Sequence, residues 1–458
     1  MLECSAFRVG PIRLASVCSY SHDSMTAANQ PADVNLAATE SAALSTTLLN
    51  ISGAPVPSAA VPSGAVPSEA TPSAAMPHLG AIPVATSPAG SGTVPSAATS
   101  SAAAPTGGLL AKTGYEKFGA FELAIVMSHY DIGAIRKIKE FPRGSRKAPK
   151  LLIKTQKEAY LLKRRAKGKD DAFKVAFCHQ LQLYLAGKQF PLPHLIGTRG
   201  ENNSMLQWGE HVYELFEFIK GVGYDASLEQ TGDSGKILAI FHKLLRDFKS
   251  DYTPPTGSYH GSRYVTTALD RIPTTLGKFN PLNRSGDEIQ QLSNTIHGAY
   301  ASAMLRINDL GLASWPAQIV HADWHPGNML FRGQRVVAVI DYDAARNQQR
   351  IIDVANGALQ FSILGGGEDP TNWPEGIDET RFKEFLSQYD GTPGGQLSRA
   401  ELKAIPWLMI EALIAEAAIP IANTGQFARM TGYQFLSMVE RKVRWFQQNA
   451  DRLAGILG

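Results

Sequence analysis

The chain of 458 residues is poor in cysteine, with only Cys4, Cys18 and Cys178. Their spacing matches neither a disulfide framework nor a set of paired metal ligands. This pattern excludes a small disulfide-stapled scaffold and a cysteine-based zinc site. A reducing compartment fits this cysteine usage, and we expect a cytoplasmic protein.

Long apolar runs are also missing. The nearest approach is residues 405–422, which contain Glu411 and Glu416. A membrane-spanning helix needs about 20 predominantly apolar residues, so we expect a buried core helix here and no membrane partner. Arg8 and Arg13 near the N-terminus are not followed by the apolar stretch of a secretory signal, and none is predicted.

Charge is scarce in the first quarter, where residues 1–112 contain only eight charged side chains. Residues 29–108 consist mainly of Ala, Pro, Ser, Gly and Thr. Such a segment has too few large apolar groups to offset the entropy of ordering. We therefore predict a disordered low-complexity leader over residues 1–115. The formal net charge of the whole chain is only +3, which gives no reason to expect a nucleic-acid partner.

Secondary-structure signals begin after this leader. Short β-type runs separated by turn residues predict a meander of antiparallel strands, and apolar residues at helical spacing over 173–186 predict one helix packed on that sheet. Together they form a predicted N-terminal nucleotide-binding lobe over residues 116–220. The predicted strands are 132–138, 151–155, 159–164 and 212–219.

The remaining residues, 221–458, have a mainly helical pattern. One β island interrupts it, with strands at 329–331 and 336–340 joined by a turn at 332–335. We therefore expect an α+β protein, in which a small sheet-containing lobe precedes a larger helical lobe that carries a single hairpin.

The densest cluster of reactive side chains flanks this hairpin. A hairpin with its turn near Gly333 and Gln334 and an assumed midpoint at about position 334.5 places Asn328 opposite Asp341 at its open end. Amide and carboxylate oxygens suit Mg²⁺, which keeps water molecules and takes other ligands from substrate phosphates. Asp323 lies in the same loop and is available to accept a proton from a hydroxyl group. The full cluster consists of His321, Asp323, Asn328, Asp341 and Asp343.

The pattern His-x-Asp-x-x-x-x-Asn, followed by a strand and Ile-Asp, resembles the catalytic and metal-binding segments of the aminoglycoside phosphotransferase, choline kinase and homoserine kinase superfamily. This resemblance covers roughly residues 128–445 and implies a two-lobed, protein-kinase-like fold that uses ATP. It implies Asp323 as the catalytic base, Asn328 and Asp341 as Mg²⁺ ligands, and His321 as a residue that supports the catalytic loop. Asp343 is expected beside the metal.

The resemblance also implies a nucleotide site in the first lobe. Gly144 and Ser145 lie in a turn between two predicted strands, where a loop of small residues can cover the phosphates of ATP. Lys163 resembles the strand lysine that pairs with the α and β phosphates, although Arg164 and Arg165 leave that position open by one or two residues. Backbone groups of the connector between the lobes would bind adenine, at Glu217, Phe218 and Ile219.

Two departures from the family pattern stand out. Ala322 occupies the position where relatives usually have glycine. The helix over 173–186 lacks the glutamate that relatives place beside the lysine. Either His179 or Gln180 takes its place, or Lys163 is held in another way.

Two further polar residues have competing interpretations. Asp353 resembles the aspartate that supports the catalytic loop in the family, and a simple helix N-cap is the alternative. His242 lies on an apolar helix face and is expected to be a packed core histidine.

These observations favour an ATP- and Mg²⁺-dependent phosphotransferase that acts on a hydroxyl of a small molecule, such as an amino alcohol, a sugar or an aminoglycoside. The alternatives are a protein Ser/Thr kinase of the same fold, a metal-dependent hydrolase that uses His321 and His325 with the aspartates, and a catalytically weak nucleotide-binding scaffold. The acceptor would lie near the C-terminal helices, whose acids suit an amine or simply form exposed helix faces. These acids are Glu401, Glu411 and Glu416.

Overall fold

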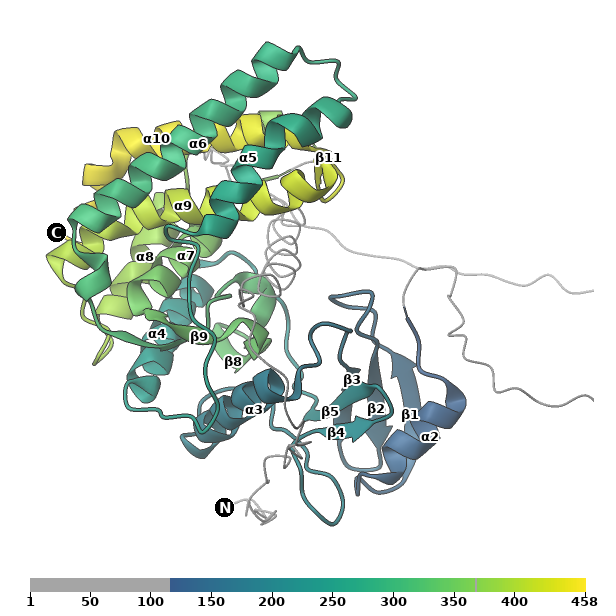
Figure 1. Cartoon of the computed structure of the whole chain (residues 1–458). Helices are drawn as coiled ribbons and strands as arrows, with labels where there is room; N and C mark the ends of the chain where they lie inside the picture. The colour runs from purple at the N-terminus through teal and green to yellow at the C-terminus, as the bar shows by residue number, and fades with distance from the viewer. Residues whose placement is uncertain (1–115, 367–368) are drawn as a thin grey trace, which may run out of the picture. The chain divides into compact units, whose positions relative to one another are not determined.

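The computed structural model describes residues 116–366 and 369–458, so the predicted leader lies outside the described residues. The N-lobe contains one antiparallel sheet with the strand order β1-β2-β3-β5-β4 (Figure 1). The predicted meander is therefore correct, with a short additional strand, β4. The strands are β1 (Ile135–Glu140), β2 (Lys150–Thr155), β3 (Ala159–Arg164), β4 (Leu206–Trp208) and β5 (His211–Glu217).

One face of this sheet is apolar because alternate residues of each strand point to the same side. Leu151, Leu162 and Leu215 lie on this face and form a core cluster with Val126 of α2 (Ala120–Ser128). The helix that covers the sheet is thus α2, which the sequence did not predict. Its nine residues make little more than two turns, too few for a helical period to stand out.

The opposite face of the sheet carries a row of charged residues. The strand register pairs Lys150 with Lys163 and Lys163 with Glu214, so the three side chains are neighbours across β2, β3 and β5. The predicted helix corresponds to α3 (Ala172–Gly187), but only its first turns pack against β5. Phe177 and Leu181 of α3 belong instead to the core of the C-lobe, so α3 connects the two lobes.

The C-lobe is built around α9 (Arg399–Thr424), which contacts four other helices (Figure 1). This helix is apolar and long enough to span a membrane, but nearly all of it is buried inside the protein, as expected for a core helix. The other helices are α4 (Leu228–Leu245), α5 (Arg263–Lys278), α6 (Gly286–Asp309), α7 (Arg350–Ser362), α8 (Glu379–Asp390) and α10 (Gly432–Ala454).

The predicted hairpin is present as β7 (Met329–Arg332) and β8 (Arg335–Val339). The expectation of a single hairpin in this lobe is wrong, because β6 (Ala317–Val320) pairs with β9 (Arg346–Gln349), and β10 (Gln426–Phe427) pairs with β11 (Met430–Thr431). The β6–β9 pair joins residues that are distant in sequence, and local periodicity does not reveal such pairing. It encloses the whole catalytic segment between two hydrogen-bonded strands.

Candidate active site

The catalytic segment starts where β6 ends, and its backbone is fixed by Asp353 of α7. The Asp353 carboxylate accepts hydrogen bonds from the backbone N–H groups of His321 and Ala322, both at 3.0 Å. His242 adds a ring nitrogen 3.2 Å from the same carboxylate, and its other ring nitrogen lies 2.8 Å from the Tyr389 hydroxyl. Asp353 therefore supports the loop, and the N-cap of α7 is Gln349 instead. His242 is buried as expected, but it also takes part in this network.

Ala322 has a backbone conformation that favours glycine. Its backbone φ is +60°, in the left-handed region that residues with a Cβ atom rarely adopt. The conformation costs about 1–2 kcal/mol for an L-residue. The two hydrogen bonds to Asp353 hold the backbone in this conformation, so the position accommodates alanine.

His321 is fully buried beside Asp323. Burial lowers the pKa of His321, which keeps the ring neutral at physiological pH. Its Nε2 atom lies 3.2 Å from the backbone oxygen of Ile340 and donates to it as the neutral N–H. His321 thus connects the catalytic loop to the end of β8, directly before Asp341.

Asp323 is held through one of its two carboxylate oxygens. Asn328 Nδ2 donates to Asp323 Oδ2 at 2.8 Å, and His325 Nε2 lies 3.5 Å from the same oxygen. His325 Nδ1 accepts the Gly327 N–H, so Nε2 carries the ring proton. Burial alone would raise the pKa of Asp323, but His325, His321 and Asn328 lower it below its ordinary value. Asp323 is therefore ionised, and no described side chain donates to its Oδ1 atom.

Asn328 and Asp341 do not face each other directly, and the prediction was wrong by one residue. The turn is centred one position earlier than assumed, with Arg332 paired to Arg335, and the bulge between Leu330 and Phe331 recovers only part of that difference. The Ile340 N–H therefore donates to the Asn328 carbonyl at 2.9 Å. Asp341 follows with φ +63°, a conformation that aspartate tolerates better than most residues. The two residues remain adjacent at the open end of the hairpin.

The oxygen atoms of Asn328 and Asp341 fit a hard cation. Asn328 directs Nδ2 to the carboxylate and the backbone oxygen of Asp323, which leaves Oδ1 as a possible ligand. The Asp341 carboxylate accepts no hydrogen bond from the described residues. Two such oxygens suit Mg²⁺ when water and phosphate supply the other ligands. The described residues contain no group of three His, Cys, Asp or Glu side chains placed to bind a metal.

Lys163 points toward the C-lobe, as alternation with the buried Leu162 predicts. Its Nζ atom lies 3.4 Å from Glu214 Oε2 and 3.5 Å from Asp343 Oδ2. Arg165, two residues later on the same side, binds Glu214 Oε1 at 2.6 Å and Asp343 Oδ1 at 2.5 Å. Burial alone would raise the pKa of Glu214, but Arg165 and Lys163 hold it well below the ordinary range. Because both Asp343 oxygens face these cations, its role beside a metal stays a prediction.

Arg164 occupies the opposite face of β3 and does not belong to this cluster. Its guanidinium binds Glu122 at 2.7 Å and Glu116 at 2.9 Å, near α2. The alternation along β3 therefore separates Arg164 from Lys163 and Arg165. Of the three cations, Arg164 is the one that the structure directs away from the catalytic loop.

Gly144 and Ser145 lie in the turn between β1 and β2. Gly144 has a φ of +77°, and a Cβ atom there would lie 3.1 Å from Lys150 Nζ. Lys150 reaches under the turn and donates to the Arg143 carbonyl at 2.9 Å. Burial and the neighbouring Lys163 lower the pKa of Lys150 to about 8. The sequence analysis missed Lys150, although its pairing partner on β3 is Lys163.

In the connector segment 217–219, two of the three backbone N–H groups already donate to acceptors within the protein. The Glu217 N–H donates to the His194 carbonyl at 2.8 Å, and the Phe218 N–H donates to the Ala159 carbonyl at 2.9 Å. Within the described part of the chain, the Ile219 N–H has no protein acceptor. Adenine recognition by this segment stays a prediction, with Ile219 as its remaining donor.

The three acids of α9 have different surroundings. Glu401 caps the helix and binds Arg350 at 3.1 Å. Glu411 and Glu416 are buried, so the interpretation of these two as exposed helix faces was wrong. Glu411 pairs with His260 at 2.8 Å. Glu416 accepts a hydrogen bond from Gln360 through one oxygen, and its Oε1 atom has no partner among the described residues.

Glu416 is also the α9 acid whose pKa the charge of Asp323 influences. Burial, and to a smaller degree the negative charge of Asp323, raise the pKa of Glu416 to about 8. A buried carboxyl group with a free oxygen near the catalytic aspartate is suited to receive a hydrogen-bond donor of a bound molecule.

Comparison with known proteins gives the family. A model of the phosphotransferase enzyme family (APH) matches residues 137–401, more than half of the chain. The chain belongs to this phosphotransferase family. Among curated proteins, the homoserine kinase of Methylocella silvestris is 26% identical over 300 residues, which are 64% of this phosphotransferase and 83% of that relative. The homoserine kinase of Beijerinckia indica is 22% identical over 312 residues, 65% and 88% of the two chains.

Solved structures confirm the predicted two-lobed fold of the phosphotransferase. A microcompartment-associated aminopropanol kinase aligns with a TM-score of 0.55 at 12% identity, covering 73% of this chain and 99% of that chain. An aminoglycoside phosphotransferase from Alicyclobacillus acidocaldarius aligns with a TM-score of 0.52 at 15% identity, covering 71% and 95%. At this level of identity the likeness establishes the fold alone.

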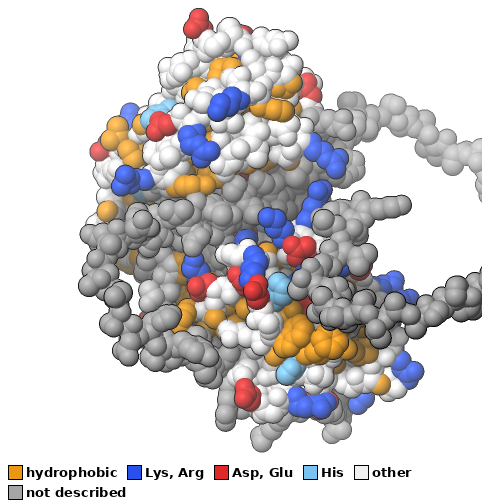
Figure 2. Space-filling model, turned by 45° about the vertical axis from the view of Figure 1, so that its right-hand side comes forward, with side chains coloured by type: hydrophobic (Ala, Val, Ile, Leu, Met, Phe, Trp, Pro, Cys, Tyr) orange, Lys and Arg blue, Asp and Glu red, His pale blue; other side chains and the backbone are white. Residues whose placement is uncertain are grey.

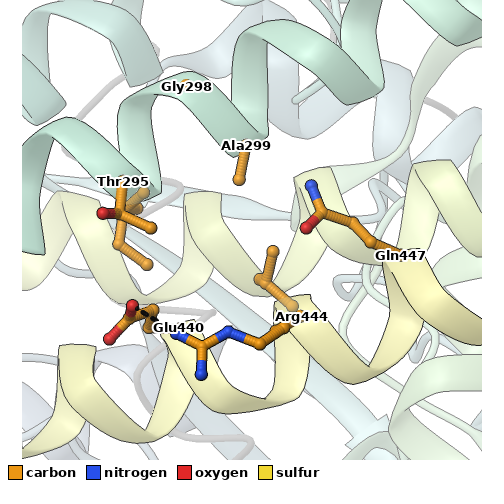
Figure 3. A pocket seen from close by; sticks show the side chains of 8 residues that line it. Thr295, Gly298, Ala299, Glu440, Arg444 and Gln447 are labelled. Atoms are coloured by element: carbon orange, nitrogen blue, oxygen red, sulfur yellow. Dashed lines mark hydrogen bonds and ion pairs between the residues drawn. The ribbon is translucent and has the colours of Figure 1, made fainter.

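The surface of the phosphotransferase carries side chains of both charges and a small hollow. On the face drawn in Figure 2, Lys and Arg side chains lie beside Asp and Glu side chains near the centre of the view. Between α6 and α10, a hollow of about 120 Å³ is lined by Thr295, Ala299 and Gln447, with the Glu440–Arg444 ion pair at its edge (Figure 3). None of the predicted site residues lines this hollow.

Proposed function

We propose that this phosphotransferase transfers the γ-phosphoryl group of ATP, in the presence of Mg²⁺, to a hydroxyl group of a small amine-bearing alcohol. The observation that carries the proposal is the state of Asp323, which is ionised, held through Oδ2 and open at Oδ1. A carboxylate fixed in this way orients a hydroxyl group and receives its proton as the new P–O bond forms.

The surrounding residues supply positioning and charge. Bound Mg²⁺ would neutralise charge on the transferred phosphoryl group, with Asn328 and Asp341 holding it. Lys163 would turn from Asp343 to the α and β phosphates. Glu214 and Asp343 would then still be paired with Arg165. Phosphoryl transfer asks the protein mainly for such alignment and charge compensation.

Glu416 supports an amine-bearing acceptor. An ammonium group on the acceptor would favour the ionised form of this carboxyl, so that binding and ionisation reinforce each other. The curated relatives named homoserine kinase and the structural relative named aminopropanol kinase fit the same acceptor class. We place the reaction in the cytoplasm, in keeping with the cysteine usage.

The test measures ADP release from ATP with homoserine, choline, 1-amino-2-propanol, an aminoglycoside and a simple sugar. 1,2-Propanediol, which lacks the amine of 1-amino-2-propanol, serves as a matched control. We expect kcat/KM for the preferred amino alcohol to exceed that for its diol counterpart by about 100-fold or more, because an unpaired buried polar group rejects the wrong ligand. Equal rates with both compounds would contradict the amine specificity.

Asp323→Asn tests the role of the base in the same assay. We expect kcat to fall by about 10²–10⁴-fold, the usual contribution of a general base. The KM for ATP should stay within about twofold, because the substitution preserves the shape of the side chain. Wild-type ADP release by the variant would disprove the assignment.

A further inference from the structure

The acid that the family resemblance implies as a partner of Lys163 is missing from the predicted helix. Helix α3 contains no aspartate or glutamate between Ala172 and Gly187. Of the two candidates named from sequence, Gln180 faces the 250–251 loop and binds Ser250 and Asp251. His179 instead is fully buried, with Nδ1 2.9 Å from the Ser204 hydroxyl and Nε2 2.7 Å from Glu214 Oε1.

Glu214 approaches Lys163 from the neighbouring strand. The two residues form a cross-strand pair between β3 and β5, so their side chains leave the sheet side by side. Glu214 Oε2 lies 3.4 Å from Lys163 Nζ and accepts no hydrogen bond from any described residue. That oxygen is the one through which Glu214 pairs with Lys163.

The other oxygen of Glu214 is fixed by two donors. Arg165 Nη1 lies 2.6 Å and His179 Nε2 lies 2.7 Å from Oε1. The side chain of Glu214 is only 1% exposed, so water does not compete for these contacts. The arrangement immobilises the carboxylate at one oxygen and presents the second oxygen to Lys163.

We propose that Glu214 of β5 positions Lys163 for the phosphates of ATP, a task that has moved in this chain from helix α3 to the sheet, and that His179 is the remaining contribution of the helix. Arg165 balances the charge of Glu214 and Asp343 when Lys163 leaves Asp343 for the nucleotide. Because Glu214 and Lys163 belong to one sheet, their alignment follows from strand pairing. This inference rests on the proposed function, in which Lys163 binds ATP.

The first experiment compares Glu214→Gln with Glu122→Gln in the full-length protein. Glu122 is a matched control, since it pairs with Arg164 on the opposite face of the same sheet. For Glu214→Gln we expect kcat/KM for ATP to fall about 100-fold, because misplacement of a phosphate-binding group by about 1 Å has effects of this size. The KM for the acceptor should not change. Glu122→Gln should retain the wild-type KM for ATP.

The decisive experiment returns the acid to the helix. The double variant His179→Glu/Glu214→His keeps both partners of the 2.7 Å contact and exchanges their positions. We expect its affinity for a non-hydrolysable ATP analogue, measured by calorimetry, to exceed that of the Glu214→His single variant by about tenfold or more. Equal affinities of the double and single variants, or a wild-type KM for ATP in Glu214→Gln, would overturn the proposal.

A further variant covers the case in which Glu214→Gln is unstable. If Glu214→Gln does not fold, Glu214→Asp keeps the charge and shortens the reach, and we expect an intermediate loss of ATP affinity with a cooperative unfolding transition. Wild-type affinity in Glu214→Asp would count against the proposal. Nucleotide binding needs no acceptor, so failure of the whole acceptor panel would reject the proposed function, while the order of ATP affinities among these variants would still decide the role of Glu214.

Discussion

The buried carboxyl groups at the candidate site differ in whether neighbouring donors and cations offset the effect of burial on their pKa. Asp323 and Glu214 are buried among donors and cations and stay ionised. Glu416 is buried beside a single amide donor, Gln360, and the burial raises its pKa to about 8. A buried carboxyl group is thus ionised in one place and a neutral hydrogen-bonding group in another, because the neighbours differ.

The pKa of Glu416 predicts a specific pH dependence of stability. The folded state keeps a proton on Glu416 up to about pH 8, whereas the unfolded chain loses it near the ordinary value of 4.5. The unfolded state therefore binds fewer protons between these values, so the stabilising contribution of the protonated form is complete below about pH 4.5 and is lost as the pH rises through about 8.

Glu416→Gln removes this titration and keeps the hydrogen-bonding shape. We expect the difference in free energy of unfolding, wild type minus variant, to decrease steadily between pH 5 and pH 9 in urea denaturation at constant ionic strength. Parallel pH curves for the two proteins would show that Glu416 does not titrate in this range.

At the scale of elements, the catalytic loop depends on α7. Asp353, on the first turn of that helix, binds two backbone N–H groups of the loop and His242 of α4. Strands β6 and β9 close the same loop at its base. A helix, a strand pair and a buried histidine thus fix a segment whose sequence contains no regular pattern of its own.

Asp353→Asn tests this anchoring. One carboxylate oxygen becomes an amide N–H that cannot accept from the loop, so a buried donor loses its partner. We expect the free energy of unfolding to fall by about 1–3 kcal/mol, with kcat reduced more than the KM for ATP. Asp378→Asn at the N-cap of α8 is a matched control, since asparagine caps a helix as well as aspartate. A loss of stability without any loss of kcat would contradict a role in placing Asp323.

Prediction of elements from sequence succeeded where the pattern was local. The β7–β8 hairpin and the strands of the meander follow from alternation and turn residues within about ten positions. The β6–β9 pair was not predicted, because its two strands lie on either side of residues 321–343. The predicted register of the hairpin was wrong by one residue because the turn is centred between Gly333 and Gln334, one position before the assumed midpoint, and the bulge offsets only part of this difference.

At the scale of the whole molecule, one buried ion cluster joins the lobes. Arg165 and Lys163 of the N-lobe contact Asp343 of the C-lobe, and α3 contributes apolar residues to the C-lobe core. A pair with this little exposure is screened weakly by salt. These contacts would fix how a nucleotide bound by the N-lobe faces an acceptor bound by the C-lobe.

Asp343→Asn distinguishes contact between the lobes from metal binding. If Asp343 mainly joins the lobes, backbone amide exchange around residues 163–166 and 342–345 should increase by about tenfold or more without nucleotide, because breaking a buried ion pair costs about 3–5 kcal/mol. The Mg²⁺ concentration for half-maximal activity should stay the same. Glu210→Gln, which removes an exposed pair with Lys167, is the control. An unchanged exchange pattern with a raised Mg²⁺ requirement would assign Asp343 to the metal.

The sequence by itself determined the family and the two lobes, because these depend on spacing within one short segment and on periodicity within single elements. Only the tertiary structure decided which acid meets Lys163, which acid of α9 lies near Asp323, and what holds the loop. These pairs of residues lie between 32 and 93 positions apart in the sequence: His321 and Asp353, Lys163 and Glu214, and Asp323 and Glu416. Their geometry arises from packing and strand register, which no local pattern contains.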